Sequence, residues 1–383
     1  MADFLPYGRH SIEDDDIAAV TEVLKNQLLT CGNKVPELEA ALSDYFAGSE
    51  VVICSNGTSA LHLAALSSGL REGNCAIVPA MTFAATANAV RMTGADVVFA
   101  DVDPENGLIT EETLKTAIEK SKWPIRAIMP VQLTGQSPNM QAIGQIATDI
   151  DATVISDACH ALGAEKAQGS SKIGSGLEED YACFSFHPVK AIAMGEGGAI
   201  VTKNKEKAAK MRLLRTHDMQ RVQNAERPWA YEMHDLGYNY RATDVQAALG
   251  LSQFKKLDRF IEKRRVLASH YNDLLKPLSP YIIPIKQTGY AVSAWHLYSV
   301  LIDFEKVGLD RAGFMKALAR QGVGSQVHYI PVSEQPYYQK LYGKQDLPGT
   351  KSYYDRTLTL PLYPAMDIAD VERVVSTIQK IVS

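Results

Sequence analysis

The sequence of 383 residues lacks the features that mark several classes of protein. No apolar stretch is long enough to cross a bilayer, and the beginning of the chain, MADFLPYGRHSIEDDD, has no basic start followed by an apolar run. Basic residues are not in excess, since 39 lysines and arginines stand against 44 acidic residues, a formal net charge of −5. We therefore expect a cytoplasmic protein whose partners are neither nucleic acid nor a membrane.

Cysteines are few, and none has the spacing of a metal site. No CxxC and no Cys/His pair at metal-binding spacing occurs among the five cysteines, Cys31, Cys54, Cys75, Cys159 and Cys183. Most of them lie in apolar runs, so we expect reduced core residues and no bound metal. Internal repeats and low-complexity tracts are also absent.

What the chain does have is a rhythm of short apolar runs, several of them separated by helical patterns. The runs lie at 51–54, 76–80, 96–103, 127–133, 153–158, 181–186 and 198–202. This alternation predicts an α/β fold with a mostly parallel seven-stranded sheet that is covered on both faces. In such sheets ligands bind beyond the carboxyl ends of the strands.

The length of the chain exceeds one ordinary core, so we expect two domains. We place a large α/β domain at residues 1–250 and a smaller α+β domain at residues 251–383. A helix is predicted over 11–25, where Ser11 is a plausible cap and acidic residues fill the first turn. One long helix is predicted over 242–275.

Lys190 lies just past the run YACFSF, close to Ser185 and followed by Gly195, Gly197 and Gly198. A buried lysine has a lowered ammonium pKa, which frees the amine to form a Schiff base. The alternative is a loop lysine in water, which is the more common fate of a lysine taken alone.

The stretch SNGTS at 55–59 stands between an apolar run and a helical pattern. Small and hydroxyl residues at a helix N-terminus favour an anion such as phosphate. The alternative is that Thr58 or Ser59 only caps the helix.

Three further residues follow apolar runs. Phe83 is placed to stack on a flat ring or to lie in the core. Asp157 ends a strand, where a buried carboxylate needs a cation such as a protonated pyridine nitrogen, or else caps a helix that begins at Ala158. His160 faces the same ligand or is a core histidine.

Taken in order, these residues are a phosphate cradle, a ring stacker, a carboxylate, a serine and a lysine. Pyridoxal phosphate needs this set: a phosphate anchor, a partner for the ring face, a pyridinium partner and a lysine for the aldimine. Each residue is a weak signal by itself, whereas the ordered set at strand ends is strong.

The sequence resembles the sugar aminotransferases of the DegT/DnrJ/EryC1/StrS family over nearly its whole length. The motifs that carry this resemblance are LLTCG (28–32), SNGTSALHLA (55–64), TFAATANAV (82–90), SDACHALGA (156–164), FSFHPVK (184–190), GEGGAIVT (195–202), GYNYRATDVQAALG (237–250) and VHYIPV (327–332). The resemblance implies pyridoxal-phosphate fold type I, the fold of aspartate aminotransferase.

The resemblance also implies roles for individual residues. Lys190 and Asp157 would be catalytic: Lys190 forms the internal aldimine and Asp157 pairs with the pyridine nitrogen. Phe83 would stack on the ring, and Asn239 would reach the phosphate from the partner subunit of a homodimer. The other expected cofactor-binding residues are Gly57, Thr58, Ser59, His160 and Ser185. The expected substrate-binding residues are Tyr7, Leu29, Thr30, His187, His328 and Tyr329.

Within the family, His160 together with SFHPVK, QVHYIP and YYQKLYG resembles the branch that acts in pseudaminic acid biosynthesis. That branch aminates C4 of a UDP-linked 4-keto-6-deoxy-N-acetylhexosamine with L-glutamate as the amino donor. The same chemistry on another nucleotide keto sugar, of the perosamine or bacillosamine type, remains open.

Three other classes are weaker alternatives. A sugar dehydratase of the same fold would carry histidine in place of Lys190. A regulator that holds the cofactor without turnover would not need the complete chemical set. A nicotinamide-binding enzyme would show GxGxxG after the first strand, and the sequence has none there.

Overall fold

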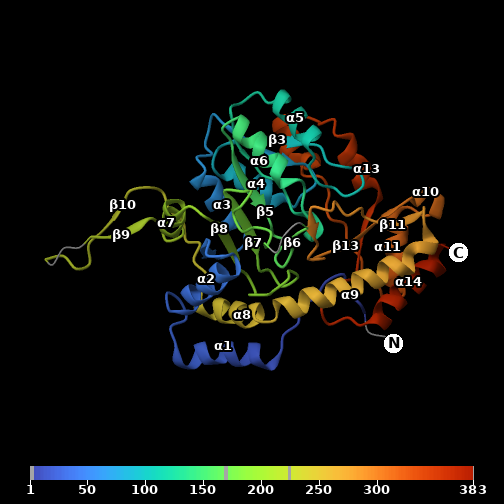
Figure 1. Cartoon of the computed structure of the whole chain (residues 1–383), viewed down its shortest axis with the longest axis horizontal. Helices are drawn as coiled ribbons and strands as arrows, with labels where there is room; N and C mark the ends of the chain where they lie inside the picture. Colours follow the sequence, from blue (N-terminus) through green and yellow to red (C-terminus); the bar gives the residue numbers. More distant parts are fainter. Residues whose placement is uncertain (1–3, 168–170, 223–225, 383) are drawn as a thin grey trace.

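The computed structural model describes residues 4–167, 171–222 and 226–382. Its centre is a seven-stranded sheet (Figure 1) with the order β1-β8-β7-β5-β4-β2-β3. The strands are β1 (Glu50–Cys54), β2 (Cys75–Pro79), β3 (Asp96–Ala100), β4 (Ile125–Ile128), β5 (Thr153–Asp157), β7 (Tyr181–Ser185) and β8 (Gly198–Thr202). The seven predicted strands are therefore confirmed. The pairs among β3, β2, β4, β5 and β7 are parallel, whereas β8 is antiparallel to both β7 and β1.

Both faces of this sheet are buried, which is why its strands read as continuous apolar runs. In β1, Val52 and Cys54 join one core cluster, while Val51 and Ile53 join another. Successive side chains of a strand point to opposite faces, so the two clusters lie on the two sides of the sheet.

Helices supply the covering layers. In the first 275 residues they are α1 (Asp14–Asn26), α2 (Lys34–Tyr45), α3 (Gly57–Ser67), α4 (Ala84–Met92), α5 (Glu111–Lys120), α6 (Met140–Asp149), α7 (Lys205–Leu214), α8 (Asp244–Phe254) and α9 (Leu257–Leu275). Helix α3 packs into the same cluster as Val52, and α2 packs into the same cluster as Val51. The helix α9 runs from the large sheet to the C-terminal part of the molecule (Figure 1).

The C-terminal part has its own core around a three-stranded antiparallel sheet. Its strands are β11 (Ile282–Pro284), β13 (Tyr298–Ile302) and β14 (Thr357–Leu360). Its helices are α10 (Phe304–Val307), α11 (Arg311–Arg320), α12 (Pro336–Tyr342), α13 (Pro348–Arg356) and α14 (Ile368–Val382). The predicted boundary after residue 250 lies inside α8, and the division of the chain there stays a prediction.

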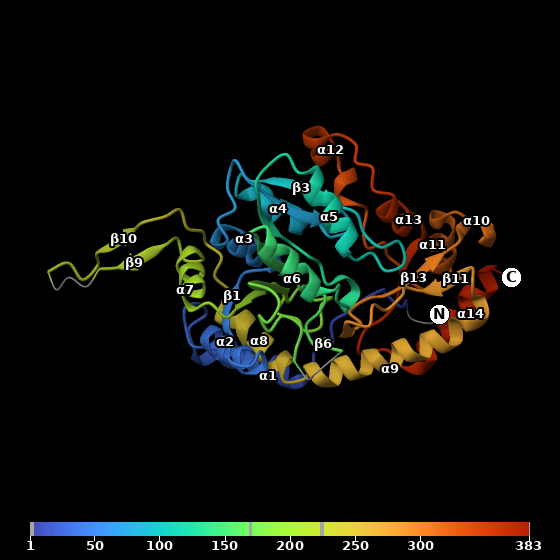
Figure 2. The ribbon, with the colours of Figure 1, turned by 45° about the horizontal axis from the view of Figure 1, so that its top comes forward.

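Two short pairs of strands complete the structure. The strands β6 (Glu165–Lys166) and β12 (Ala291–Val292) pair with each other and so join the two halves of the chain. The strands β9 (Met219–Arg221) and β10 (Tyr231–Met233) form a hairpin that projects from the body of the molecule (Figures 1 and 2). The sequence analysis predicts no strand at these positions, so it missed this hairpin.

Two predicted helices differ from the structure. The first helix begins at Asp14 with Glu13 as its cap, and not at Ser11, whose carbonyl accepts a hydrogen bond from the Gln253 side chain. The long helix over 242–275 is broken between α8 and α9. At the break, the Lys256 ammonium lies 2.5 Å from an Asp15 carboxylate oxygen and 2.9 Å from Asp16, so this junction is pinned to the first turn of α1.

Candidate functional site

A cavity of about 570 Å³ lies at the carboxyl ends of β5 and β7, where the sequence places the chemistry. Residues from both halves of the chain line it. The predicted residues on its wall are Tyr7, Gly57, Thr58, Phe83, Asp157, His160, Ser185, His187, Lys190, His328 and Tyr329.

Lys190 is half-buried in this cavity, in the turn that follows β7, where its amide donates to the His187 carbonyl at 2.8 Å. Burial lowers the pKa of its ammonium below 10.5, and the nearby Cys159 and Asp157 act in the opposite direction. In the described part of the chain, no carboxylate forms an ion pair with this lysine. The amine is therefore poised to lose its proton and act as a nucleophile.

Asp157 is the last residue of β5, and its side chain is buried. One carboxylate oxygen accepts the Thr86 hydroxyl at 2.7 Å, and the other accepts the Cys159 amide at 3.2 Å. No helix follows at Ala158, so the helix-cap alternative is wrong. No salt bridge within the described residues neutralises this carboxylate, which leaves it suited to a cationic partner in the cavity.

The sequence reading missed Thr86. It lies in the first turn of α4, three residues after Phe83, and its hydroxyl also lies 2.7 Å from that of Thr82. The sequence feature that could have identified Thr86 is a hydroxyl residue in the first turn of a helix that directly follows a strand. The contact of Thr86 with Asp157 joins residues that are 71 positions apart in the sequence, so only the three-dimensional structure shows the role of Thr86.

The N-terminus of α3 forms the other end of the cavity. Asn56 caps the helix, and its side-chain oxygen accepts the Ser59 amide at 2.8 Å, so the cap is neither Thr58 nor Ser59. The backbone amides of Gly57 and Thr58 therefore remain without an acceptor in the part of the chain that the structure describes. Free amides at a helix N-terminus bind anions.

Close packing shapes this end of the cavity. A Cβ atom on Gly57 would lie 2.8 Å from the Ser185 Cβ, and one on Gly198 would collide with the Asn56 carbonyl. Glycine at both positions lets the α3 N-terminus approach β7 and β8 closely enough to leave a small polar cradle beside Ser185.

Aromatic rings form the opposite wall. Phe83 is 58% exposed and tilts against Tyr329, with ring centroids 5.7 Å apart, so one of its faces is open to a flat ligand. Tyr7 contacts His328 at 5.4 Å between centroids.

Three histidines, two of them predicted, surround the lysine. Burial lowers the pKa of His328 to about 3 and holds the pKa values of His160 and His296 well below 6.5, so all three are neutral near pH 7. The sequence reading missed His296, which stands before β13 and reaches the cavity across the junction between the two halves. A lone histidine before a strand gave no signal.

Four predicted residues lie away from the wall of the cavity. The Ser59 hydroxyl is 2.9 Å from that of Ser55, behind the α3 N-terminus. Leu29 and Thr30 are exposed in the loop before α2, and Asn239 is exposed at the foot of the β9–β10 hairpin, where it bridges Thr216.

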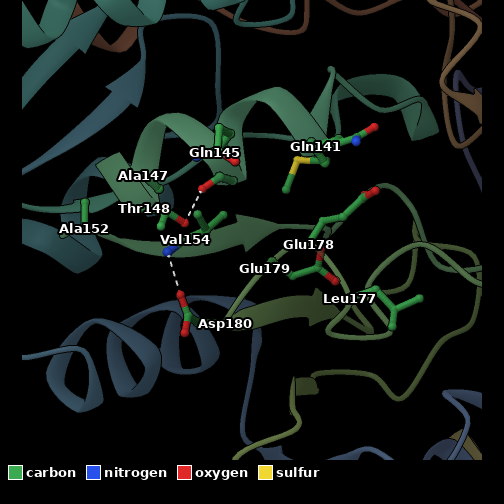
Figure 3. A pocket seen from close by; sticks show the side chains of 12 residues that line it. Gln141, Gln145, Ala147, Thr148, Ala152, Val154, Leu177, Glu178, Glu179 and Asp180 are labelled. Carbon is green, nitrogen blue, oxygen red and sulfur yellow. Dashed lines mark hydrogen bonds between the residues drawn. The ribbon is translucent and has the colours of Figure 1, made fainter. Parts of the chain in front are cut away.

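A second hollow, of about 380 Å³, lies at the amino ends of β5 and β7 (Figure 3). There the Val154 amide donates to Asp180 at 3.0 Å, and Glu178 pairs with Lys166 at 2.8 Å. Burial raises the pKa of Glu179 in this hollow to about 7. Among the described residues that line it there is neither an aromatic ring nor a lysine, so its chemistry differs from that of the first cavity.

Other classes of site are not found. Among residues 4–167, 171–222 and 226–382, no group of three or more histidine, cysteine or acidic residues is arranged to hold a metal ion. In the same ranges, no helix is both long and apolar enough to span a bilayer. The five cysteines are free, and Cys31 is exposed, so the prediction of a core position is wrong for that residue.

The donor groups of the cavity fit pyridoxal phosphate. The free amides of α3 with Ser185 suit the phosphate, the exposed face of Phe83 suits the ring, and the unpaired carboxylate of Asp157 suits a protonated pyridine nitrogen. Lys190 faces the same space, as covalent attachment requires.

Relatives cover the whole chain. A UDP-4-amino-4,6-dideoxy-N-acetyl-β-L-altrosamine transaminase of Campylobacter jejuni subsp. jejuni serotype O:23/36 is 38% identical over 374 residues, which cover 98% of this chain and 96% of that protein. The spore coat polysaccharide biosynthesis protein SpsC of Bacillus subtilis is 36% identical and covers 99% of this chain and 97% of its own length.

Solved structures have the same fold. Helicobacter pylori PseC, an aminotransferase involved in the biosynthesis of pseudaminic acid, superposes with a TM-score of 0.90 at 28% identity and covers 99% of each chain. Spr1654 from Streptococcus pneumoniae, solved in a pyridoxal phosphate form, has a TM-score of 0.89 at 25% identity and covers 99% of this chain and 98% of that one.

The sequence model of the DegT/DnrJ/EryC1/StrS aminotransferase family matches residues 10–379. The fold is therefore the predicted pyridoxal-phosphate fold type I, and the expected cofactor is confirmed. The chain belongs to the DegT/DnrJ/EryC1/StrS aminotransferase family and is a pyridoxal-phosphate-dependent aminotransferase.

Proposed function

We propose that this enzyme transfers the amino group of L-glutamate to C4 of a nucleotide-linked 4-keto-6-deoxy sugar. The sugar nucleotide is UDP-4-keto-6-deoxy-N-acetylhexosamine, and the pathway is pseudaminic acid biosynthesis. The observation that carries the proposal is a half-buried lysine with a lowered pKa in the same cavity as an unpaired buried carboxylate. The 38% identity with the Campylobacter transaminase over 98% of the chain supports the choice of sugar.

Each residue has a defined task in this proposal. Pyridoxal phosphate, when bound, supplies an aldehyde for the amino group and a ring that accepts negative charge. Lys190 Nζ would hold the cofactor and, once released, would take up and return the proton of the amino acid Cα. Asp157, aligned by the Thr86 hydroxyl at 2.7 Å, keeps the pyridine nitrogen protonated. The amides of Gly57 and Thr58, with the Ser185 hydroxyl, hold the phosphate.

The sugar nucleotide occupies the remaining space of the cavity. Tyr7, His187, His328 and Tyr329 line that space, so they are the proposed sugar-binding residues of this chain. Burial lowers the pKa of His328 to about 3, so this side chain binds as a neutral group, which suits a sugar with hydroxyl and carbonyl oxygens. Leu29 and Thr30 lie outside the cavity of a single chain, so their proposed contact with substrate involves an assembled dimer.

The active unit in this proposal is a homodimer with shared sites. The β9–β10 hairpin projects from the body of the molecule (Figure 2). Its side chains Met219, Trp229 and Tyr231 are 46–73% exposed, which supports a second copy as the partner. Asn239 lies exposed at the foot of this hairpin, outside its own cavity, and is proposed to reach the phosphate in the site of the second copy.

Mixing two inactive variants tests the shared site. Lys190→Ala and Asn239→Ala each impair turnover, and a hybrid dimer contains one site with both native residues if Asn239 acts across the interface. Random mixing then restores about a quarter of wild-type activity, since half of the dimers are hybrids with one intact site. If Asn239 acts within its own subunit, the mixture regains no activity, and the proposal of shared sites is wrong.

A substrate panel tests the function itself. The purified enzyme is incubated with L-glutamate and with UDP- and GDP-linked 4-keto-6-deoxy sugars, and the products are identified by mass spectrometry and NMR. The expected result is amination at C4 of the UDP-linked N-acetylhexosamine with release of 2-oxoglutarate. Preference for a perosamine-type or bacillosamine-type precursor would change the sugar and keep the chemistry. Amination of none of them would refute the substrate class.

A further inference from the structure

Three backbone segments converge behind the aromatic wall of the cavity. The turn at Leu133–Gly135 places Thr134 at φ 62°, and a Cβ atom on Gly135 would lie 2.9 Å from the His160 carbonyl and 3.0 Å from the Trp295 amide. Only glycine allows this approach. The convergence fixes the position of His160 relative to the Thr134 amide.

The tautomer of His160 follows from this contact. The Thr134 backbone amide lies 3.3 Å from His160 Nδ1, and a backbone amide can only donate, so Nδ1 is the acceptor and carries no hydrogen. A neutral imidazole then has its hydrogen on Nε2, which is 3.1 Å from the Tyr329 hydroxyl oxygen. The His296 ring packs on His160 with centroids 4.4 Å apart and restrains its rotation.

Tyr329 links this arrangement of hydrogen bonds to the cavity. Its oxygen accepts the His160 hydrogen, so its own hydrogen points elsewhere, and the described residues offer it no other acceptor. Burial raises the pKa of Tyr329 well above 10, so the phenol keeps its proton. Tyr329 lines the cavity together with Lys190, so its free hydrogen is available to a ligand bound there.

We propose that Thr134, His160 and Tyr329 form a hydrogen-bond relay that aims the Tyr329 hydroxyl hydrogen at an oxygen atom of the bound ligand. Tyr329 is the binding residue, and His160 acts through it as a positioning residue. The recognised chemistry is an oxygen acceptor, either the phenolic oxygen attached to the cofactor ring or an oxygen of the sugar; only the second source rests on the proposed function.

A double-mutant cycle tests the relay. Tyr329→Phe removes the donor, and His160→Asn still accepts the Thr134 amide but is too short to reach Tyr329. Each is expected to weaken ligand binding roughly 3- to 10-fold, the contribution of one hydrogen bond. The double variant is expected to lose no more than about twofold beyond either single variant, because both changes remove the same aimed donor.

Two control variants separate the relay from a structural role. His160→Gln retains an N–H that reaches Tyr329 and is expected to bind within about twofold of wild type. Tyr271→Phe removes a buried hydroxyl that donates to the Pro361 carbonyl at 3.0 Å outside the cavity, and it should leave ligand binding unchanged. Losses that add fully in the double variant, or no rescue by glutamine, would overturn the relay.

Two binding measurements distinguish the cofactor from the sugar as the ligand that accepts the hydrogen bond of Tyr329. A raised dissociation constant for pyridoxal phosphate, measured without any sugar, assigns the acceptor to the cofactor. An unchanged cofactor constant with a raised KM for the keto sugar assigns it to the substrate, and no change in either overturns the proposal. The cofactor arm gives its result even if no keto sugar is aminated, so the two proposals fail separately.

The tautomer is also directly observable in the wild-type holoenzyme. Nitrogen-15 NMR of labelled histidine, with His160 assigned by its loss in His160→Gln, is expected to show a hydrogen on Nε2 and none on Nδ1. A hydrogen on Nδ1 would contradict the relay whatever the variants do.

Discussion

The two hollows lie at opposite ends of the same strands, β5 and β7, but they differ in the chemistry of the side chains that line them. Both lie beside the same strands, and each holds a carboxylate: Asp157, which is buried, at the carboxyl edge and Glu179, which is half-buried, at the amino edge. The carboxyl-edge cavity adds a lysine and aromatic rings beside the N-terminus of α3. The amino-edge hollow has Lys166 already paired with Glu178 at 2.8 Å.

The difference shows that a buried acid does not by itself make a site. Asp157 is oriented by a hydroxyl and an amide and has no cation of its own within the described residues, whereas the acids of the other hollow are satisfied by neighbouring lysines and amides. The carboxyl edge is where helix N-termini and loops gather in a parallel sheet, so ligand chemistry collects there. Matched substitutions at the two edges test this contrast.

The largest difference is expected between substitutions of the two lysines, one at each edge. Lys190→Ala should lower turnover about 1,000-fold or more and abolish the absorption band of the lysine-bound cofactor near the visible edge, because the attachment point and proton carrier are both lost. Lys166→Ala at the other edge should leave both unchanged. Steady-state kinetics and absorbance spectra measure the pair. Wild-type turnover in Lys190→Ala would mean that Lys190 is not the catalytic lysine.

Asp157 and Glu179, the acids at the two edges, give the next contrast. Asp157→Asn keeps the hydrogen bond from Thr86 but carries no charge, so it cannot stabilise a proton on the pyridine nitrogen. Turnover should fall about 100-fold or more while pyridoxal phosphate remains bound. Glu179→Gln should turn over at the wild-type rate. Equal losses in the two variants would mean that Asp157 acts only through the stability of the fold.

Glycines at the two edges provide a smaller contrast. A Cβ atom in Gly198→Ala collides with the Asn56 carbonyl, so the N-terminus of α3 must shift, with a loss of about 1–3 kcal/mol in stability and weaker binding of the cofactor. In Gly144→Ala the new atom lies 3.3 Å from the Glu178 carbonyl, a contact that small movements relieve. Thermal melts and cofactor titrations compare them. Unchanged cofactor affinity in Gly198→Ala would argue against the cradle.

The same contrast explains how much the sequence could predict. The seven strands and the residues just after them are readable, because burial on both faces produces apolar runs and the site lies where each run ends. Thr86 and His296 were not readable, since what brings them to the site is packing between distant segments. The choice of Asn56 as the cap was also hidden, because three neighbouring residues have similar capping preferences.

The misread helices have a related cause. The helical pattern runs on through Lys255 and Lys256, and only the contacts of Lys256 with Asp15 and Asp16 show where the helix is interrupted. The strands of the β9–β10 hairpin are only three residues long and carry no continuous apolar run, and Met219, Tyr231 and Met233 are all exposed. Strands this short and exposed leave only a weak pattern in the sequence.

The smallest effect concerns stability at the amino edge. Burial raises the pKa of Glu179 from 4.5 to about 7, so the folded protein holds this proton more tightly than the unfolded chain does. Between these values the unfolded state has lost the proton and the folded state retains it, so this residue makes the protein less stable as the pH rises from 4.5 to about 7.

Glu179→Gln removes this titration and retains an oxygen for the Gly176 amide, which lies 2.9 Å away. The variant should gain about 1–2 kcal/mol over wild type at pH 8 and little or nothing at pH 5, as measured by urea unfolding at both values. An equal gain at both pH values would mean that the change acts through packing. No gain at pH 8 would mean that the carboxylate ionises without cost, and the amino edge would then tolerate an unpaired acid as well as the carboxyl edge does.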